Sequence, residues 1–145
     1  MNVFCDDGVR FEYPDDWSLA RETGAGRITL HLQTPGAAFW CLTLLTDCPS
    51  AAEAIEAAAA AYQAEYPQVD VYRDVAPLEG GPAAGCNLDF VYVDLVSSVS
   101  LRAEETNEFT ALVLYQGEDR ELEEYRPQFE AVTASLRYGG ELAEG

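Results

Sequence analysis

The chain has 145 residues, 48% of them hydrophobic, and its 26 acidic side chains against eight arginines give a formal net charge of -18. This length predicts one domain that can bury a core without help from a metal or a disulfide. The negative charge repels phosphate backbones and anionic lipid surfaces, so nucleic acid and membranes are excluded as expected partners and a basic or hydrophobic protein segment remains.

The first predicted strand ends in a turn that leads to a tryptophan. Phe11 and Tyr13 alternate and therefore lie on one face of a short strand. Pro14 cannot donate a hydrogen bond to a neighbouring strand, and Asp15-Asp16 favour a turn. We expect Trp17 to return to the core after that turn.

The next segments predict two strands and a helix. Residues 27–33 alternate between apolar and polar side chains, which indicates a half-buried strand. Residues 39–46 are apolar on both faces, as in a strand in the middle of a sheet that is covered on both sides. Ser50 and Glu53 form a capping box, which predicts a helix over residues 50–66.

The second half of the chain predicts further strands and a final helix. We expect a short strand with Val69, Val71 and Val75, a break at Gly80-Gly81-Pro82, a long strand over 84–95, and a strand centred on Val99 and Leu101 that directs Arg102 and Glu104 outward. A hairpin turn at 105–107 leads into a strand over 109–116, and apolar residues at helical spacing predict a helix over 119–138. Residues 1–139 are read as one domain and residues 140–145 as a short flexible tail.

This order of elements predicts an α+β fold, in which a central antiparallel sheet carries helices on both faces. Two segments, residues 11–17 and Phe129-x-x-Val132-x-x-Ser135, resemble the PsbP-like superfamily. That superfamily includes the photosystem II extrinsic subunit PsbP, a Ran-binding nuclear import factor and bacterial DcrB-like proteins. The resemblance implies a PsbP-like α/β/α sandwich, a fold that hosts binding proteins more often than enzymes.

Candidate catalytic groups are few. His31 is the only histidine and shares the polar face of its strand, where a solvated or hydrogen-bonded role is favoured over that of a catalytic base. Asp89 interrupts an apolar strand and either pairs with an arginine, meets solvent or lines a pocket. No residue pattern calls for a cofactor, and the acidic turns lack the spacing of a calcium loop. The sequence favours a non-enzymatic protein and leaves an enzyme open.

The expected cellular compartment determines the expected oxidation state of the cysteines. The first residues lack the basic and apolar runs of a signal peptide, and no apolar stretch is long enough to span a membrane, which predicts a cytoplasmic protein. The four cysteines are therefore expected to be free thiols, with Cys41 and Cys86 in the core. The expected state is a monomer or a homodimer.

The leading functional interpretation is an acidic binding, adaptor or chaperone-like protein that shields a basic or hydrophobic segment of a partner. Bacterial relatives implied by the resemblance include small cytoplasmic chaperones of secreted toxins. The predicted partner-binding patch consists of five acids, Glu104, Glu105, Glu108, Glu118 and Asp119. The alternatives are a small-molecule-binding protein or enzyme with a pocket between sheet and helix, and a structural protein with no dedicated site.

Overall fold

The computed structural model describes residues 1–72 and 83–139. Within these ranges the chain forms ten strands and two helices. In chain order they are β1 (Asn2–Asp6), β2 (Val9–Tyr13), β3 (Ser18–Gly24), β4 (Arg27–Gln33), β5 (Phe39–Leu45), α1 (Ala51–Glu65), β6 (Val69–Tyr72), β7 (Ala83–Tyr92), β8 (Leu95–Glu105), β9 (Thr110–Glu118), α2 (Asp119–Ala134) and β10 (Arg137–Tyr138).

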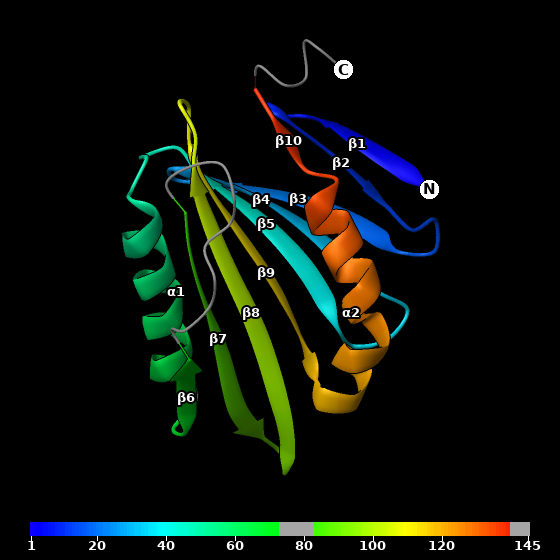
Figure 1. Cartoon of the computed structure of the whole chain (residues 1–145), viewed down its shortest axis with the longest axis vertical. Helices are drawn as coiled ribbons and strands as arrows, with labels where there is room; N and C mark the ends of the chain where they lie inside the picture. The colour runs from blue at the N-terminus through cyan, green and yellow to red at the C-terminus, as the bar shows by residue number, and fades with distance from the viewer. Residues whose placement is uncertain (73–82, 140–145) are drawn as a thin grey trace.

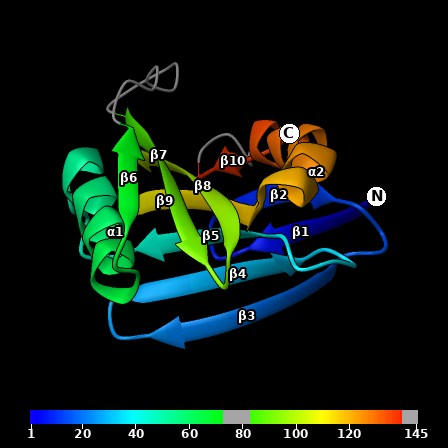
Figure 2. The ribbon, with the colours of Figure 1, turned by 90° about the horizontal axis from the view of Figure 1, so that it is seen from below.

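The strands form two antiparallel sheets (Figures 1 and 2). The larger sheet has seven strands in the order β3-β4-β5-β9-β8-β7-β6, and the smaller one has three in the order β1-β2-β10. The larger sheet is thus the central antiparallel sheet that the element order predicts. The separate small sheet was not predicted.

The two helices cover opposite faces of the large sheet. On β9, Val113 and Tyr115 belong to the core that contains α2, whereas Leu112 and Leu114 pack against the core that contains α1. Because side chains alternate along a strand, these two cores lie on the two faces of the sheet. The expected arrangement of helices on both faces is confirmed, and in Figure 1 the sheet lies between α1 and α2.

Helix α1 begins as the capping box predicts. The Glu53 backbone N–H donates to the Ser50 hydroxyl at 3.1 Å, and the Ser50 N–H donates to Glu53 Oε1 at 3.4 Å. Ala54, Ile55 and Ala59 are buried against β7 and β8. The small volume of the two alanines lets the helix approach the sheet closely.

Helix α2 ends earlier than predicted. Its last residue is Ala134, and Arg137–Tyr138 form β10, which pairs with β2. The Ser135 hydroxyl accepts a hydrogen bond from the Glu12 N–H at 2.9 Å and donates to the Val132 carbonyl at 2.6 Å. This side chain ends the helix and directs the chain to the edge of β2, so the prediction of a helix to residue 138 is wrong.

The predicted strand over 84–95 is also interrupted. Val93 and Asp94 have φ angles of 49° and 63°, and the chain reverses there, so that Tyr92 pairs with Leu95. The first of the two predicted strands therefore ends at Tyr92 as β7, and the predicted strand centred on Val99 and Leu101 begins at Leu95 as β8. The predicted positions of Val75, of the Gly80-Gly81-Pro82 break and of the tail at 140–145 lie outside the described residues.

Trp17 lies in the core, as its position after the turn predicts. It is 4% exposed, and its ring contacts those of Tyr125 and Phe129 at centroid distances of 6.2 and 5.3 Å. The turn at residues 14–17 therefore holds the end of β2 against α2. Within residues 1–72 and 83–139, neither helix is long and apolar enough to cross a membrane.

Candidate functional site

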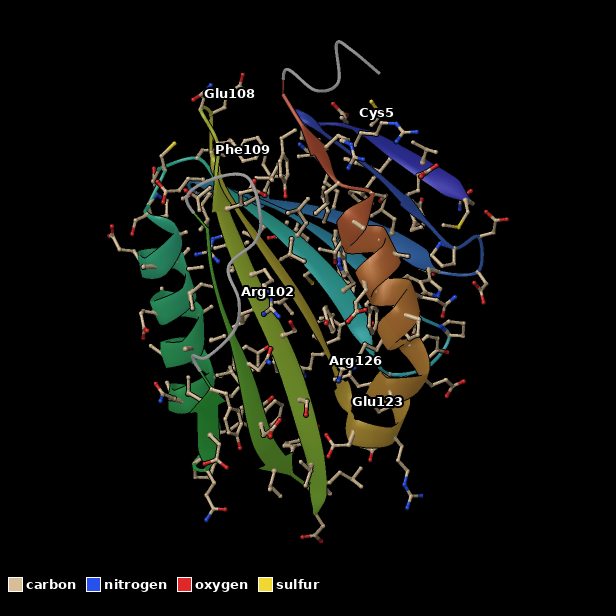
Figure 3. All side chains as sticks on the ribbon, in the orientation of Figure 1. Cys5, Arg102, Glu108, Phe109, Glu123 and Arg126 are labelled. Carbon is tan, nitrogen blue, oxygen red and sulfur yellow. The ribbon has the colours of Figure 1, made fainter. Side chains whose placement is uncertain are left out.

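The five acids of the predicted patch do not form one surface. The β8–β9 register pairs Glu105 with Thr110 at one end of the ladder and Ser97 with Glu118 at the other. Glu104, Glu105 and Glu108 thus lie about 27 Å along the strand from Glu118. In Figure 3, Glu108 lies at the top of the molecule, and Glu123, early in α2, lies far below it. Binding of a partner by either group stays a prediction.

Three of these acids satisfy hydrogen-bond donors of the fold itself. Glu105 Oε2 accepts from the Ala51 N–H at 3.0 Å, at the start of α1. Glu118 is the N-cap of α2 and accepts from two N–H groups of its first turn. Asp119 lies 2.8 Å from the Ser98 hydroxyl. Their first role is therefore to end strands and begin helices.

Sequence reasoning missed an exposed apolar surface at the β7–β8 turn. We call Val91–Val96 the hairpin tip. Its apolar side chains range from 43% exposed at Val96 to 74% at Val93. The pairing of β6 ends at Phe90 and that of β9 at Ser97, so the tip extends beyond both neighbouring strands. Among the described residues, the Tyr66 ring contacts Tyr92 edge-on at a centroid distance of 5.9 Å, and the apolar side chains of the tip stay exposed.

The backbone of the hairpin tip is strained. A two-residue hairpin turn with two positive φ angles normally contains Asn-Gly or Asp-Gly. Here the residues are Val93 and Asp94, and Val93 is β-branched with φ 49°. A non-glycine residue in this region costs on the order of 1–3 kcal/mol. Stability alone does not explain a valine here, because an asparagine would relieve the strain and expose less apolar surface.

Acidic side chains surround the base of the hairpin tip. Asp94 lies in the turn itself, and Asp70 of β6 pairs directly with Asp89 of β7. These two carboxylates raise the pKa of the exposed Tyr72 hydroxyl, Asp70 more than Asp89. Asp89 and Asp119 also lie 2.7 and 2.8 Å from the same Ser98 hydroxyl. The apolar tip is therefore presented in a negative field.

A second feature is a groove of about 690 Å³ between α2 and the sheet, which we call the α2 groove. Its lining comes from β8 (Ser100, Arg102, Glu104), β9 (Val113, Tyr115), α2 (Glu130, Thr133, Ala134) and the chain after α2 (Leu136, Arg137, Tyr138). Arg102 and Glu104 were expected to point outward. They instead lie on the face of the sheet that carries α2, and together with residues of α2 they line this groove.

Arg102 is partly buried in the α2 groove (Figure 3). Its Nη1 donates to the Leu101 carbonyl at 2.8 Å and lies 3.5 Å from Asn87 Oδ1. Burial lowers the pKa of its guanidinium, with smaller opposing contributions from Tyr115, Cys86 and Glu130. Across the ladder, a Cβ on Gly85 would lie 2.9 Å from Arg102 Cδ, so the glycine makes room for the arginine.

Ser100 lies beside Arg102 on the same face of β8. The residue is 5% exposed, and its hydroxyl has no hydrogen-bond partner among the described residues. It lines both the α2 groove and a smaller hollow that includes Asp89 and Arg126. Arg126 reaches toward the sheet from α2 and is held by Glu123 Oε1 at 2.9 Å (Figure 3). Asp89 thus lines a hollow on the α2 face.

His31 has the hydrogen-bonded role that the sequence favoured, with a partner that the sequence did not indicate. Its Nδ1 lies 3.1 Å from Cys41 Sγ, and its Nε2 lies 3.1 Å from Gln33 Oε1. Burial raises the pKa of the Cys41 thiol to about 12, with a smaller contribution from Glu22. The thiol is therefore neutral near pH 7 and lacks the thiolate that a cysteine nucleophile needs. Only the β4–β5 register brings the pair together.

Comparisons with known proteins show the fold. No protein-family model matches the chain, and no curated protein matches it either. The solution structure of PsbP (CyanoP) from Synechocystis sp. PCC 6803 is 14% identical with a TM-score of 0.58, over 94% of this chain and 91% of that one. LpqN, involved in cell envelope biogenesis of Mycobacterium tuberculosis, is 13% identical with a TM-score of 0.53, over 92% and 86%. The chain therefore has a PsbP-like fold, as its sequence resemblance implied.

Proposed function

We propose that this chain, with its PsbP-like fold, is a non-enzymatic binding protein whose hairpin tip docks onto a basic, amphipathic segment of another protein. The observation that carries the proposal is the exposed apolar tip, where Tyr92, Val93 and Leu95 are each more than half exposed. Contiguous exposed apolar surface on a soluble domain marks interaction sites. The strained turn supports the same role, since strain of this kind is retained at functional positions.

The charge around the tip selects the partner. Asp94 in the turn and the Asp70–Asp89 pair at its base attract a segment that places lysines or arginines beside its apolar side chains. Glu118 and Asp119 of the predicted patch begin α2 beside Ser97 and Ser98 and extend this acidic rim. The tip would shield such a segment in the manner of an adaptor or chaperone.

A second copy of the chain is a less favourable partner for the hairpin tip than a basic segment of another protein. Two tips that met face to face would bring Asp94 against its own counterpart, and each copy carries a net charge of -18. Like charges across an interface cost free energy that the apolar contact would first have to offset. The proposal is therefore a contact between different proteins, made by a monomer.

The proposed setting is the cytoplasm. All four cysteines are free thiols, and Cys5 and Cys48 are exposed. Exposed thiols persist in a reducing compartment and oxidise outside it. An enzymatic alternative receives less support, because the one histidine contacts a neutral thiol rather than an activated nucleophile.

The test is binding of labelled synthetic peptides, measured by fluorescence anisotropy. We expect an amphipathic Leu/Lys helical peptide to bind, a Leu/Glu peptide of the same pattern not to bind, and a Ser/Lys peptide to bind weakly. Combining Tyr92→Ser with Leu95→Ser should weaken binding of the Leu/Lys peptide about tenfold or more. Added salt should also weaken it, because part of the attraction is electrostatic.

Val3→Ser is the matched control, because Val3 is 49% exposed and lies on β1, away from the tip. It should leave the peptide affinity unchanged. Equal binding of the Leu/Glu peptide, or full binding by the double variant, would contradict the proposal. Size-exclusion chromatography that showed a dimer dissolved by the tip substitutions would assign the surface to a second copy instead.

A further inference from the structure

The α2 groove contains features that the proposed protein contact at the hairpin tip does not use. We propose that this groove binds a small organic carboxylate with an apolar body, whose carboxylate group contacts Arg102 and Ser100. This site lies between α2 and the sheet, and none of its lining residues belongs to the tip.

Arg102 is the cation of the proposed site. Within the described part of the chain, its guanidinium takes part in no ion pair, although acids outnumber arginines by 26 to eight. Within residues 1–72 and 83–139, the two hydrogen-bond contacts of its guanidinium both involve Nη1, and Nε and Nη2 contact no acceptor there. A planar fork of N–H donors matches the two oxygens of a carboxylate.

Ser100 supplies an independent indication. A buried hydroxyl without a partner is costly and uncommon in a folded protein. Ser100 precedes Arg102 by two residues on β8, so both side chains face the groove, and the serine hydroxyl reaches no partner within residues 1–72 and 83–139. A carboxylate oxygen at Arg102 would satisfy this hydroxyl.

The rest of the lining favours a carboxylate over a phosphate. Val113, Ala134 and Leu136 provide apolar contacts for a hydrocarbon body. Glu104 and Glu130 line the same groove, and their charge opposes a ligand that carries two negative charges. A volume of about 690 Å³ is within the range of small-molecule sites.

The test is titration of the protein with octanoate, followed by backbone amide NMR shifts. We expect saturable shifts at Ser100, Arg102, Tyr115 and Thr133. Octanol and octylamine should bind at least about tenfold more weakly, because they lack the anion. Octyl phosphate should also bind more weakly than octanoate. Equal or tighter binding of octanol would reduce the site to an apolar hollow, and tighter binding of octyl phosphate would overturn the assignment to a carboxylate.

Two variants and a control keep the test decisive. Arg102→Gln should lower the octanoate affinity about tenfold or more, and Ser100→Ala should lower it about threefold without lowering the melting temperature of the free protein. Arg27→Gln removes the same charge from an exposed position of β4 and should change nothing. Equal losses for Arg27→Gln and Arg102→Gln would overturn the site, since bulk charge would explain both.

The proposal for the α2 groove and the proposal for the hairpin tip can be contradicted independently of each other. The protein with Tyr92→Ser and Leu95→Ser should bind octanoate as the wild type does. Loss of octanoate binding in that variant, with its fold intact by circular dichroism, would contradict a separate site in the α2 groove. Failure of the peptide test alone would leave the octanoate result standing.

Discussion

Glu105 Oε2 accepts a hydrogen bond from the Ala51 N–H at 3.0 Å, and so joins the end of β8 to the first residue of α1. The first N–H groups of a helix have no partner within the helix. A carboxylate at this position also interacts favourably with the helix dipole. The acid that appeared to be a partner-binding residue from sequence therefore connects two elements of the fold.

Replacement of Glu105 by alanine should lower the free energy of unfolding by about 0.5–2 kcal/mol, as does the loss of a helix cap. Glu105→Gln should cost less, because the amide oxygen still accepts from Ala51. Urea unfolding measures both. Glu108→Ala, in the exposed turn, is the control and should change stability by less than about 0.5 kcal/mol. Equal costs at the two positions would show that the hydrogen bond contributes nothing.

Trp17→Ala should lower the free energy of unfolding by about 3–5 kcal/mol, because the residue is only 4% exposed, between α2 and the turn at residues 14–17. The cost combines lost apolar burial with the cavity that remains beside Phe129. Chemical unfolding of the variant measures it. A loss below about 1 kcal/mol would mean that the side chain is not buried in solution.

The two tryptophans should differ when each is replaced by phenylalanine. Trp40 Nε1 donates to Thr133 Oγ1 at 3.0 Å, whereas Trp17 Nε1 is buried without a partner among the described residues. Trp40→Phe loses a hydrogen bond, and Trp17→Phe removes an unsatisfied donor. We expect Trp40→Phe to be the more destabilising by about 1 kcal/mol, measured by urea unfolding. The reverse order would contradict this account.

Val93→Asn should raise the free energy of unfolding by about 1 kcal/mol, because asparagine tolerates positive φ better than a β-branched residue. The same substitution should weaken binding of the Leu/Lys peptide, since it removes apolar surface from the hairpin tip. Thermal unfolding and anisotropy on one preparation test both effects. A variant that gains stability and keeps full binding would remove the functional explanation of the strain.

Cys41 should make stability depend on alkaline pH. Its folded pKa is about 12, against 9.0 for the free group, because burial disfavours the thiolate. The contribution of the neutral thiol is complete below pH 9. It is lost between pH 9 and about 12, where the unfolded chain is deprotonated and the folded one is not, at about 1.4 kcal/mol per pH unit.

Cys41→Ala provides the comparison. Urea unfolding at pH 8 and pH 10 should show a stability advantage of the wild type over the variant that shrinks by about 1.4 kcal/mol at the higher pH. Effects of other titrating groups cancel in this difference. A difference that stays constant between the two pH values would mean that the thiol is not desolvated.

The predictions that were confirmed rest on patterns that are local in sequence. The capping box of Ser50 and Glu53 satisfies its donors within four residues, and the alternation at 27–33 needs only one buried face. Strands β1 and β3 were missed because they are edge strands with mostly exposed side chains, and neither sequence alternates between apolar and polar residues over its whole length. The turn at Val93-Asp94 lacks the glycine or asparagine that marks a hairpin.

The candidate sites were less predictable than the fold because they depend on register. His31 and Cys41 meet only through the pairing of β4 with β5. The separation of Glu105 from Glu118 follows from the length of β9, and the position of Arg102 in the α2 groove follows from which face of the sheet carries the helix. No local pattern carries this information. The exposed apolar run at 91–96 was visible, but it reads equally well as a buried strand.

The pairing of β8 has a consequence for how the two proposed sites would work together. Residues 95 and 96 pair with β7 alone, whereas from Ser97 to Glu104 the strand is bonded to β7 on one side and β9 on the other. Bending of the hairpin tip should therefore not displace Ser100, because β8 is held on both sides from Ser97 onward. Binding of a carboxylate in the α2 groove and binding of a partner at the hairpin tip should therefore be thermodynamically independent. The protein should bind its partner with the same affinity whether or not the groove is occupied.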